Sequence, residues 1–352
     1  MLDTLGQLIQ EMLRHTFVNP QSPQTRAVSN LFWVGGTVAT IILAIPTIVL
    51  LYTITHFRHK PDQQGEPHQV YGFRSLEIAW TVIPTIIVLV IFVLSIHTQG
   101  LAEPNTDPGP SGRSDLTVIG HQWWWELRYP SGVVSANEIH IPVRTRWLVS
   151  LKSADVVHGF WVPQVGNQMY LIPGQTNHIW LEADKPGVYE GQCAEFCGAQ
   201  HAWMLLRVIA QPQAAFDAWQ HGQSRAAPRP TGQAGAAPPP STGTGNTIAR
   251  LRQPATGSTA SLVAGGAQLF QQLPCQSCHA IAGTRANADI GPDLTHLASR
   301  ATLAAGRLDN TPANLKDWLR DPQEYKEGSH MPNLLLTSNQ IDALTAYLES
   351  LK

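Results

Sequence analysis

Cys193-Ala-Glu-Phe-Cys-Gly-Ala-Gln-His-Ala-Trp-Met204 is the stretch around which the fold of the chain must be arranged, because it concentrates metal-binding side chains in one loop. It holds the thiols of Cys193 and Cys197, the imidazole of His201 and the thioether of Met204. Such soft and borderline donors favour copper over magnesium or calcium. Two thiolates this close can bridge two metal ions. A disulfide or a zinc site is the alternative, but a disulfide explains neither His201 nor Met204, and a thioether is a poor zinc ligand.

The donor set lacks a second imidazole, which His158 in Asp155-Val-Val-His-Gly-Phe-Trp-Val-Pro163 is best placed to supply. The surrounding residues 115–210 contain short runs rich in β-forming residues, separated by turns such as Pro173-Gly174. This pattern predicts a β-sandwich or barrel that holds the metal loop rigid. The expected strands are 116–119, 138–141, 146–151, 178–181 and 205–209.

Two apolar runs precede this region. Residues 31–55 and 78–98 contain no Asp, Glu, Lys or Arg, and each reaches the roughly 20 residues that span a bilayer core. Pro46 and Pro84 lie inside them, as membrane helices tolerate. Buried helices of a globular domain are the alternative, which two such runs in succession disfavour. We therefore expect a transmembrane hairpin.

The segment that joins the two runs carries Arg58, Lys60 and Arg74. This excess of basic residues places the segment in the cytoplasm and everything after residue 100 outside it. Residues 1–30 show no clear secretory signal, so a processed precursor and insertion led by the first span both stay open. The net charge of −2 argues against electrostatic binding of nucleic acid.

The C-terminal residues 261–352 contain Cys275-Gln-Ser-Cys-His279, the attachment motif of a c-type haem. Two thioether bonds would come from Cys275 and Cys278, and His279 would be the proximal iron ligand. Zinc binding or chance is the alternative, which the helical surroundings disfavour. Helix signals flank the motif, including Thr311-Pro312 and a capping box at Thr337.

Met331 in His330-Met-Pro332 is the expected sixth ligand of the haem iron, and His330 and His296 are its rivals. Met331 is favoured by its Met-Pro context, its separation from His279, and the higher potential that methionine ligation gives. The segment Gly291-Pro-Asp-Leu294 resembles the loop that follows the haem motif in cytochromes c, and this resemblance implies that the Pro292 carbonyl orients His279.

Residues 222–260 are rich in Ala, Pro, Gly, Ser and Thr and cannot bury a core. A flexible chain of this length spans about 35 Å, which keeps a small domain close at high effective concentration. The expected layout is an extracytoplasmic segment 1–30, a membrane hairpin 31–100, a metal domain 101–215, a linker 216–260 and a haem domain 261–352.

The motif Cys-x-Glu-x-Cys-Gly-x2-His-x2-Met, after an isolated Asp-Val-x-His, resembles the binuclear CuA site of cytochrome c oxidase subunit II over roughly residues 20–215. Residues 261–352 resemble a class I cytochrome c. The combination resembles subunit II of a caa-type haem–copper oxidase. The implied fold class is multidomain, with a two-helix transmembrane hairpin, a cupredoxin-like β-barrel and a C-terminal all-α cytochrome c domain.

This resemblance implies a role for each residue of the loop. Cys193 and Cys197 would bridge two coppers, with one copper bound by His158 and the other by His201. Met204 would be a weak axial ligand. Glu195 would offer its backbone carbonyl to copper, and its side chain would reach a magnesium ion shared with subunit I.

Two more residues gain roles from the same resemblance. Trp123, in Gly120-His-Gln-Trp-Trp-Trp-Glu126, would be the point where electrons arrive at CuA; the alternative is that the tryptophans are core or membrane-interface residues. Glu77 would lie at the mouth of a proton-uptake channel into subunit I, or be an ordinary interfacial carboxylate. A carboxylate at a membrane boundary is a functional candidate by default.

The sequence departs from the resemblance where a soluble, basic cytochrome c would dock. Residues 127–132 lack the acidic cluster of family members, and Tyr170 stands where many relatives have Asp. These departures put docking of a free cytochrome in doubt. The fused haem domain is a replacement donor.

The sequence therefore predicts a subunit II that passes electrons from its own haem c to CuA and on to subunit I. There, oxygen would be reduced to water with proton translocation. The expected partners are subunit I, subunit III, membrane lipid, and an upstream quinol–cytochrome c reductase or soluble cytochrome c, with no nucleic acid. The expected location is the bacterial plasma membrane, with both metal domains on the periplasmic side. A CuA subunit of a nitric-oxide reductase and a membrane-anchored carrier without a catalytic partner remain as alternatives.

Overall fold

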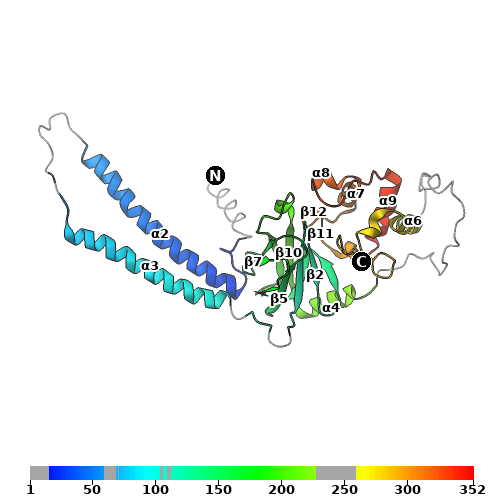
Figure 1. Ribbon diagram of the computed structural model, residues 1–352, viewed down its shortest axis with the longest axis horizontal. Coiled ribbons are helices and arrows are strands. Elements are labelled where there is room, and N and C mark those ends of the chain that lie inside the picture. The colour runs from blue at the N-terminus through cyan, green and yellow to red at the C-terminus, as the bar shows by residue number, and fades with distance from the viewer. Residues whose placement is uncertain (1–15, 59–68, 70, 104–105, 109–111, 227–258) are drawn as a thin grey trace. The chain divides into compact units, whose positions relative to one another are not determined.

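The computed structural model describes residues 16–58, 69, 71–103, 106–108, 112–226 and 259–352 (Figure 1). The first half of the expected N-terminal segment, most of the expected linker, and the basic Lys60 lie outside the described residues. The chain divides into two compact units, Met1–Asn105 and Thr106–Lys352.

The first unit contains two long helices, α2 (Pro23–His56) and α3 (Arg74–Ala102), which pack on each other. Ser22 caps α2 by accepting a hydrogen bond from the backbone N–H of Thr25 at 3.2 Å, and Pro23 follows at the first helical position. Both helices begin before the apolar runs and end beyond or near their last residues, because the charge-free run marks only the part that meets hydrocarbon. Nearly all of their large apolar side chains are exposed, as a lipid-facing surface requires. They are the two membrane spans.

Two five-stranded sheets form the first half of the second unit, with strand orders β3-β2-β1-β5-β8 and β4-β10-β9-β6-β7. The strands of the first sheet are β1 (Leu116–His121), β2 (Trp124–Arg128), β3 (Val134–Ala136), β5 (Trp147–Ser153) and β8 (Asn177–Leu181). Those of the second are β4 (Glu138–Pro142), β6 (His158–Trp161), β7 (Met169–Leu171), β9 (Gly187–Cys193) and β10 (Leu205–Gln211).

The inner faces of the sheets share one core, in which Trp125, Phe160 and Leu151 are fully buried. The expected cupredoxin-like fold is confirmed as a β-sandwich. All five expected strands are present within one or two residues of their bounds. The other five strands were not predicted. Among them, β2 is buried on both faces and shows no alternation of apolar and polar residues.

Helix α4 (Gln213–Gln223) follows β10 and crosses the expected boundary between metal domain and linker. Its Phe216 and Trp219 pack on the sandwich, where Trp219 stacks on His140 at 4.0 Å between ring centroids. The predicted linker therefore begins too early, since a composition-based boundary missed two aromatic anchors spaced three residues apart.

The second half of this unit is helical, with α6 (Thr259–Gln272), α7 (Pro312–Arg320), α8 (Pro322–Tyr325) and α9 (Ser338–Glu349). Helices α6 and α9 cross closely because Gly266 has no side chain: a Cβ there would lie 2.0 Å from the carbonyl oxygen of Ala343. Thr337 and Gln340 form the predicted capping box of α9. A two-stranded sheet, β11 (Thr302–Leu303) with β12 (Leu308–Asp309), is an addition to the expected all-α fold.

Candidate metal centre and haem pocket

Sheet pairing brings the metal-binding segments together. Strand β9 ends at Cys193, and β6 begins at His158 and pairs with β9 so that Phe160 lies opposite Cys193. The loop after β9 returns through a short 3-10 helix, η2 (His201–Trp203), to Met204 just before β10. The backbone N–H of Cys193 donates to the carbonyl of Met204 at 3.0 Å, which closes the loop.

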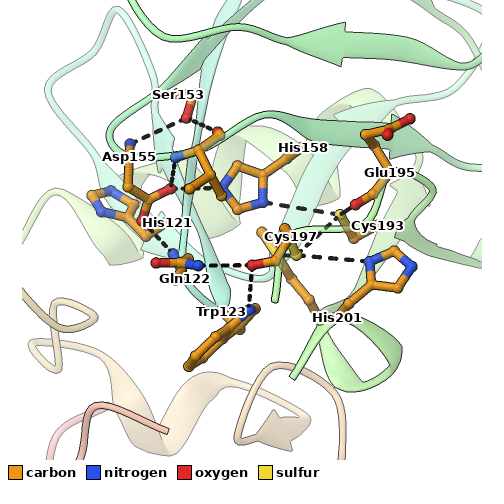
Figure 2. Close-up of polar contacts among 12 residues, drawn as sticks. His121, Gln122, Trp123, Ser153, Asp155, His158, Cys193, Glu195, Cys197 and His201 are labelled. Atoms are coloured by element: carbon orange, nitrogen blue, oxygen red, sulfur yellow. Dashed lines mark hydrogen bonds and ion pairs between the residues drawn. The ribbon is translucent and has the colours of Figure 1, made fainter. Parts of the chain in front are cut away.

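The imidazoles of His158 and His201 point toward the sulfurs of Cys193 and Cys197 (Figure 2). The Cys193 and Cys197 sulfurs are 3.7 Å apart. His158 Nδ1 lies 3.9 Å from the Cys193 sulfur, and His201 Nδ1 lies 3.7 Å from the Cys197 sulfur. Met204 Sδ lies 3.8 Å from the Cys197 sulfur. Each sulfur thus has its own imidazole, the arrangement that two metal ions bridged by two thiolates need, and the soft donors fit copper.

Glu195 contributes its backbone at this centre. Its carbonyl oxygen lies 3.2 Å from the Cys193 sulfur. Figure 2 shows the carboxylate of Glu195 pointing away from the two sulfurs. The carbonyl and the carboxylate of this residue therefore face different surroundings.

Asp155 fixes the orientation of His158. Its Oδ1 accepts a hydrogen bond from His158 Nε2 at 2.8 Å, and its Oδ2 accepts one from the backbone N–H of Gln122 at 2.6 Å. Burial acts to lower the pKa of His158, but the hydrogen bonds to Cys193 and Asp155 outweigh it and raise that pKa. With Nε2–H held by Asp155, the Nδ1 lone pair faces the sulfurs. Asp155 was not among the predicted site residues, although it stands three positions before His158.

The two thiols perturb each other because their sulfurs are in contact. The hydrogen bond from Cys197 lowers the pKa of the Cys193 thiol, and the same contact raises the pKa of Cys197. One thiolate therefore forms easily at this site, and thiolate is the form that binds metal.

Trp123 lies against the metal loop. Its Nε1–H donates to the carbonyl oxygen of Cys197 at 2.9 Å, and Gln122 Nε2 donates to the same oxygen at 2.8 Å. Trp123 is buried, and its ring also meets the ring of His330 with 5.1 Å between centroids. It thus contacts both Cys197 of the metal loop and His330 of the C-terminal domain.

A cavity in the helical half collects the predicted haem-binding residues. They are Cys275, Cys278, His279 and Met331. Gln122, Trp123 and Trp124 of the sandwich also line this cavity. His279 Nδ1 donates to the carbonyl of Pro292 at 2.8 Å, which leaves Nε2 free to bind iron. Burial is the main cause of the lowered pKa of His279, and the neutral imidazole is the form that binds metal.

Two observations show that the cavity fits a haem. A Cβ at Gly291 would lie 2.6 Å from Cε1 of His279. Only glycine at this position therefore leaves enough space for the imidazole ring of His279. Arg300 lines the cavity, and its buried Nε has no hydrogen-bond partner among the described residues. A buried guanidinium with an unused donor suits an anionic group such as a haem propionate. Arg300 gave no signal in the sequence.

The rivals of Met331 differ in position. His296 does not line the cavity, and its Nε2 is bonded to the carbonyl of Arg225 at 2.9 Å. His330 lines the cavity but packs on Trp123. Gln323 Nε2 donates to the carbonyl of Met331 at 2.7 Å and holds that backbone segment. The geometry favours Met331.

We expect Met331→Ala to abolish the low-spin His/Met spectrum of the haem, because no other thioether lines the cavity in the part of the chain that the structure describes. Visible and near-infrared spectroscopy of the oxidised protein measures this loss. His296→Ala is the control and keeps the spectrum. An unchanged spectrum in Met331→Ala rules Met331 out.

Glu77 lies in the first turn of α3, exposed, in the membrane unit. It is not part of either centre described above. A negative charge in the first turn of a helix is favoured by the helix dipole, so its position is also consistent with a structural role.

The chain combines two membrane spans, a thiolate site suited to two metal ions and a pocket suited to a c-type haem. These features define a membrane-anchored electron-transfer protein. Three family models match the chain: "Cytochrome C oxidase subunit II, transmembrane domain" over residues 11–98, "Cytochrome C oxidase subunit II, periplasmic domain" over 131–211, and "Cytochrome c" over 263–352.

Similar proteins span nearly the whole chain. Cytochrome c oxidase subunit 2 of Alkalihalophilus pseudofirmus is 35% identical over 96% of this chain and 91% of its own length. That of Bacillus sp. PS3 is 32% identical over 84% and 79%. The crystal structure of the periplasmic domain of subunit II of cytochrome oxidase (CoxB) of Bradyrhizobium japonicum is 31% identical, covers 32% of this chain and 94% of that chain, and has a TM-score of 0.30.

The chain belongs to the cytochrome c oxidase subunit II family, in a form that carries its own cytochrome c domain. Membership of this family implies a CuA copper centre, and the cytochrome c domain implies a haem c. Subunit I of a haem–copper oxidase is its partner. The two helices lie in the bacterial plasma membrane, with the sandwich on the periplasmic side. The nitric-oxide reductase and the partnerless carrier are not favoured.

Proposed function

We propose that this subunit supplies electrons from its own haem c to CuA and on to subunit I, where oxygen is reduced to water with proton translocation. The observation that carries the proposal is the place of Trp123. This residue lines the haem cavity, and its Nε1–H donates to the carbonyl of Cys197.

The residues of the copper loop have separate roles in this proposal. Cys193 and Cys197 would hold the two metal ions together, and His158 and His201 would each bind one of them. Met204 and the carbonyl of Glu195 are weak additional ligands. When bound, the copper pair supplies one-electron chemistry. The chain itself holds the donors in place with a sandwich that need not move, which keeps reorganisation small.

The haem domain has matching roles. Cys275 and Cys278 would attach the haem covalently, and His279 and Met331 would bind its iron. Trp123 is the point where electrons arrive at the copper loop. Its indole is hydrogen-bonded to the carbonyl of Cys197 and packs against the ring of His330.

Further partners belong to this proposal as well. The carboxylate of Glu195, turned away from the sulfurs, binds a magnesium ion together with subunit I. Glu77 at the start of α3 helps to admit protons into subunit I. Subunit III and lipid surround the hairpin, and a quinol–cytochrome c reductase or soluble cytochrome c reduces the haem. We keep the five-region layout, with the metal domain extended through α4.

Removing the haem domain tests the electron route. We expect a chain truncated after Ala226, which keeps α4 whole, to retain copper in the assembled oxidase but to lose most of its oxygen uptake with a small artificial reductant. Cyanide-sensitive oxygen uptake measures this, and the intact complex and the copper content of the truncated complex are the controls. Uptake as fast as in the intact complex contradicts the route through the fused haem. Nitric-oxide consumption without oxygen uptake by the intact complex overturns the oxidase assignment.

A further inference from the structure

The helical half of the second unit is bonded directly to the sandwich through two buried ionisable side chains, one of which reaches the copper loop. Lys326, just after α8, belongs to the haem domain, and Glu138, at the start of β4, belongs to the sandwich. They are 4% and 2% exposed. A buried charged group is costly unless it is fully hydrogen-bonded, so their partners are informative.

Lys326 reaches across to the backbone on both sides of the copper site. Its Nζ donates to the carbonyl of Trp123 at 3.0 Å and to the carbonyl of Trp203 at 3.1 Å. Trp203 directly precedes the copper ligand Met204, and the side chain of Trp123 binds Cys197. Burial lowers the pKa of Lys326 to about 7, whereas Cys197 acts in the opposite direction. Both the ammonium and the amine carry N–H donors, so the two contacts form in either state.

Glu138 makes the reciprocal contact from the sandwich. Its carboxylate accepts hydrogen bonds from the backbone N–H of Ala301 at 3.0 Å and of Thr302 at 2.8 Å. The hydroxyl of Thr302 adds a third bond at 2.7 Å. Three donors satisfy the carboxylate of this buried acid, and the neighbouring Arg300 guanidinium adds an attractive charge interaction.

Three further contacts join the same two halves. Gln200 donates to the carbonyl of Glu327 at 2.5 Å, and the backbone N–H of Leu205 donates to the carbonyl of Ala305 at 3.1 Å. The Arg307 guanidinium lies 3.9 Å over the Trp203 ring. Every one of these partners in the sandwich is within the metal loop or next to its end.

We propose that Lys326 is a positioning residue: with Glu138, it locks the haem domain onto the copper loop in one fixed arrangement, with the haem cavity facing Trp123. This inference rests on the proposed electron route. The lock uses backbone atoms as partners, so it does not depend on opposite surface charges. The linker between the two domains therefore raises the rate at which the haem domain docks. The contacts of Lys326 and Glu138 define the position of the docked haem domain relative to the copper loop.

A salt-dependence measurement separates this lock from electrostatic docking. Exposed charges more than a Debye length apart are screened by salt, whereas buried polar contacts are screened much less. We expect the rate of electron transfer from haem c to copper in the intact oxidase to stay constant between low and high ionic strength. A rate that falls steeply with added salt contradicts the lock.

Lys326→Met tests the lock directly, because methionine fills similar space and has no N–H. In the purified oxidase, we expect the rate of haem c oxidation by copper, followed by stopped-flow absorbance, to fall about tenfold, as the loss of two hydrogen bonds from a buried polar group predicts. We also expect the single distance between ferric haem and oxidised copper, measured by pulsed electron paramagnetic resonance, to become a broad distribution. Lys316→Met, at a half-exposed lysine of the same domain paired with Asp342, is the matched control and changes neither.

Glu138→Gln provides the second variant, because Glu138 lies in the sandwich, outside the haem attachment motif Cys275-Gln-Ser-Cys-His279. The haem c spectrum of this variant checks that the neighbouring Arg300 and the haem pocket are undisturbed. The substitution removes the charge that holds two N–H groups, and we expect the same broadening of distances and a slower rate. If both variants keep the wild-type rate and distance, the lock is wrong and the electron route stands. If the wild-type oxidase shows no transfer from haem c to copper, the proposed route itself fails.

Discussion

Cys197→Ser is expected to eliminate the binuclear copper site, and with it all oxygen uptake that depends on electrons from the haem. The Cys197 sulfur contacts three of the other four side-chain donors. It lies 3.7 Å from the Cys193 sulfur, 3.7 Å from His201 Nδ1 and 3.8 Å from Met204 Sδ. A serine hydroxyl is a hard donor that stays protonated at neutral pH and cannot bridge two soft ions. Metal analysis and copper electron paramagnetic resonance of the purified complex measure the loss.

The haem provides an internal control for this variant. Its attachment motif lies in the other half of the unit, so the haem c spectrum of Cys197→Ser should equal that of the wild type. Val162→Ala, at a fully buried residue of the same sandwich that carries no donor, is the matched control for a perturbed core and keeps its copper. Two coppers per chain with an unchanged resonance signal in Cys197→Ser would show that Cys197 does not bridge them.

The copper loop could be predicted from the sequence because its ligands are local. Four of the five side-chain donors stand between Cys193 and Met204, and the loop geometry follows from a strand on each side. His158 lies outside this loop, and it was predicted as a ligand from its Asp-Val-x-His context. Asp155 was visible in that same context, but its bond to His158 depends on how the turn before β6 folds.

Contacts between the two halves of the second unit could not be predicted. Lys326 and Trp123 are 203 positions apart in the sequence, and Glu138 and Thr302 are 164 positions apart. A lysine near the end of a short helix usually faces solvent, and nothing in the sequence around Lys326 marks it as buried. Composition predicted a tethered domain and its reach, but docking depends on the shape of two folded surfaces.

The missed secondary structure has a common cause. Strand β2 contains Trp124 and Trp125, both buried, so the alternation expected of a half-exposed strand is absent. Helix α4 lies in a stretch of polar and small residues, and only Phe216 and Trp219 mark its apolar face. Tertiary packing decided both elements, where local pattern was weak.

Asp155→Ala is expected to weaken copper binding by about 10- to 100-fold, the usual effect of removing a partner that orients a metal-binding histidine. The His158 side chain is fully buried, and Asp155 is the acceptor for its Nε2–H. Without that acceptor, the ring can rotate or change tautomer, and Nδ1 no longer points steadily at the Cys193 sulfur. Competition with a copper chelator measures the affinity.

Asp155→Asn separates orientation from charge at this position. The amide oxygen of asparagine can still accept from His158 Nε2, but its NH2 group then meets the backbone N–H of Gln122, which now donates to Asp155. We therefore expect an affinity between those of the wild type and Asp155→Ala, with altered copper hyperfine couplings in both variants. Asp217→Ala, at an exposed carboxylate on α4, is the control and leaves the affinity unchanged. Wild-type affinity and couplings in Asp155→Ala would mean that packing within the sandwich alone fixes the orientation of His158. The Asp155 carboxylate would then only stabilise the turn before β6.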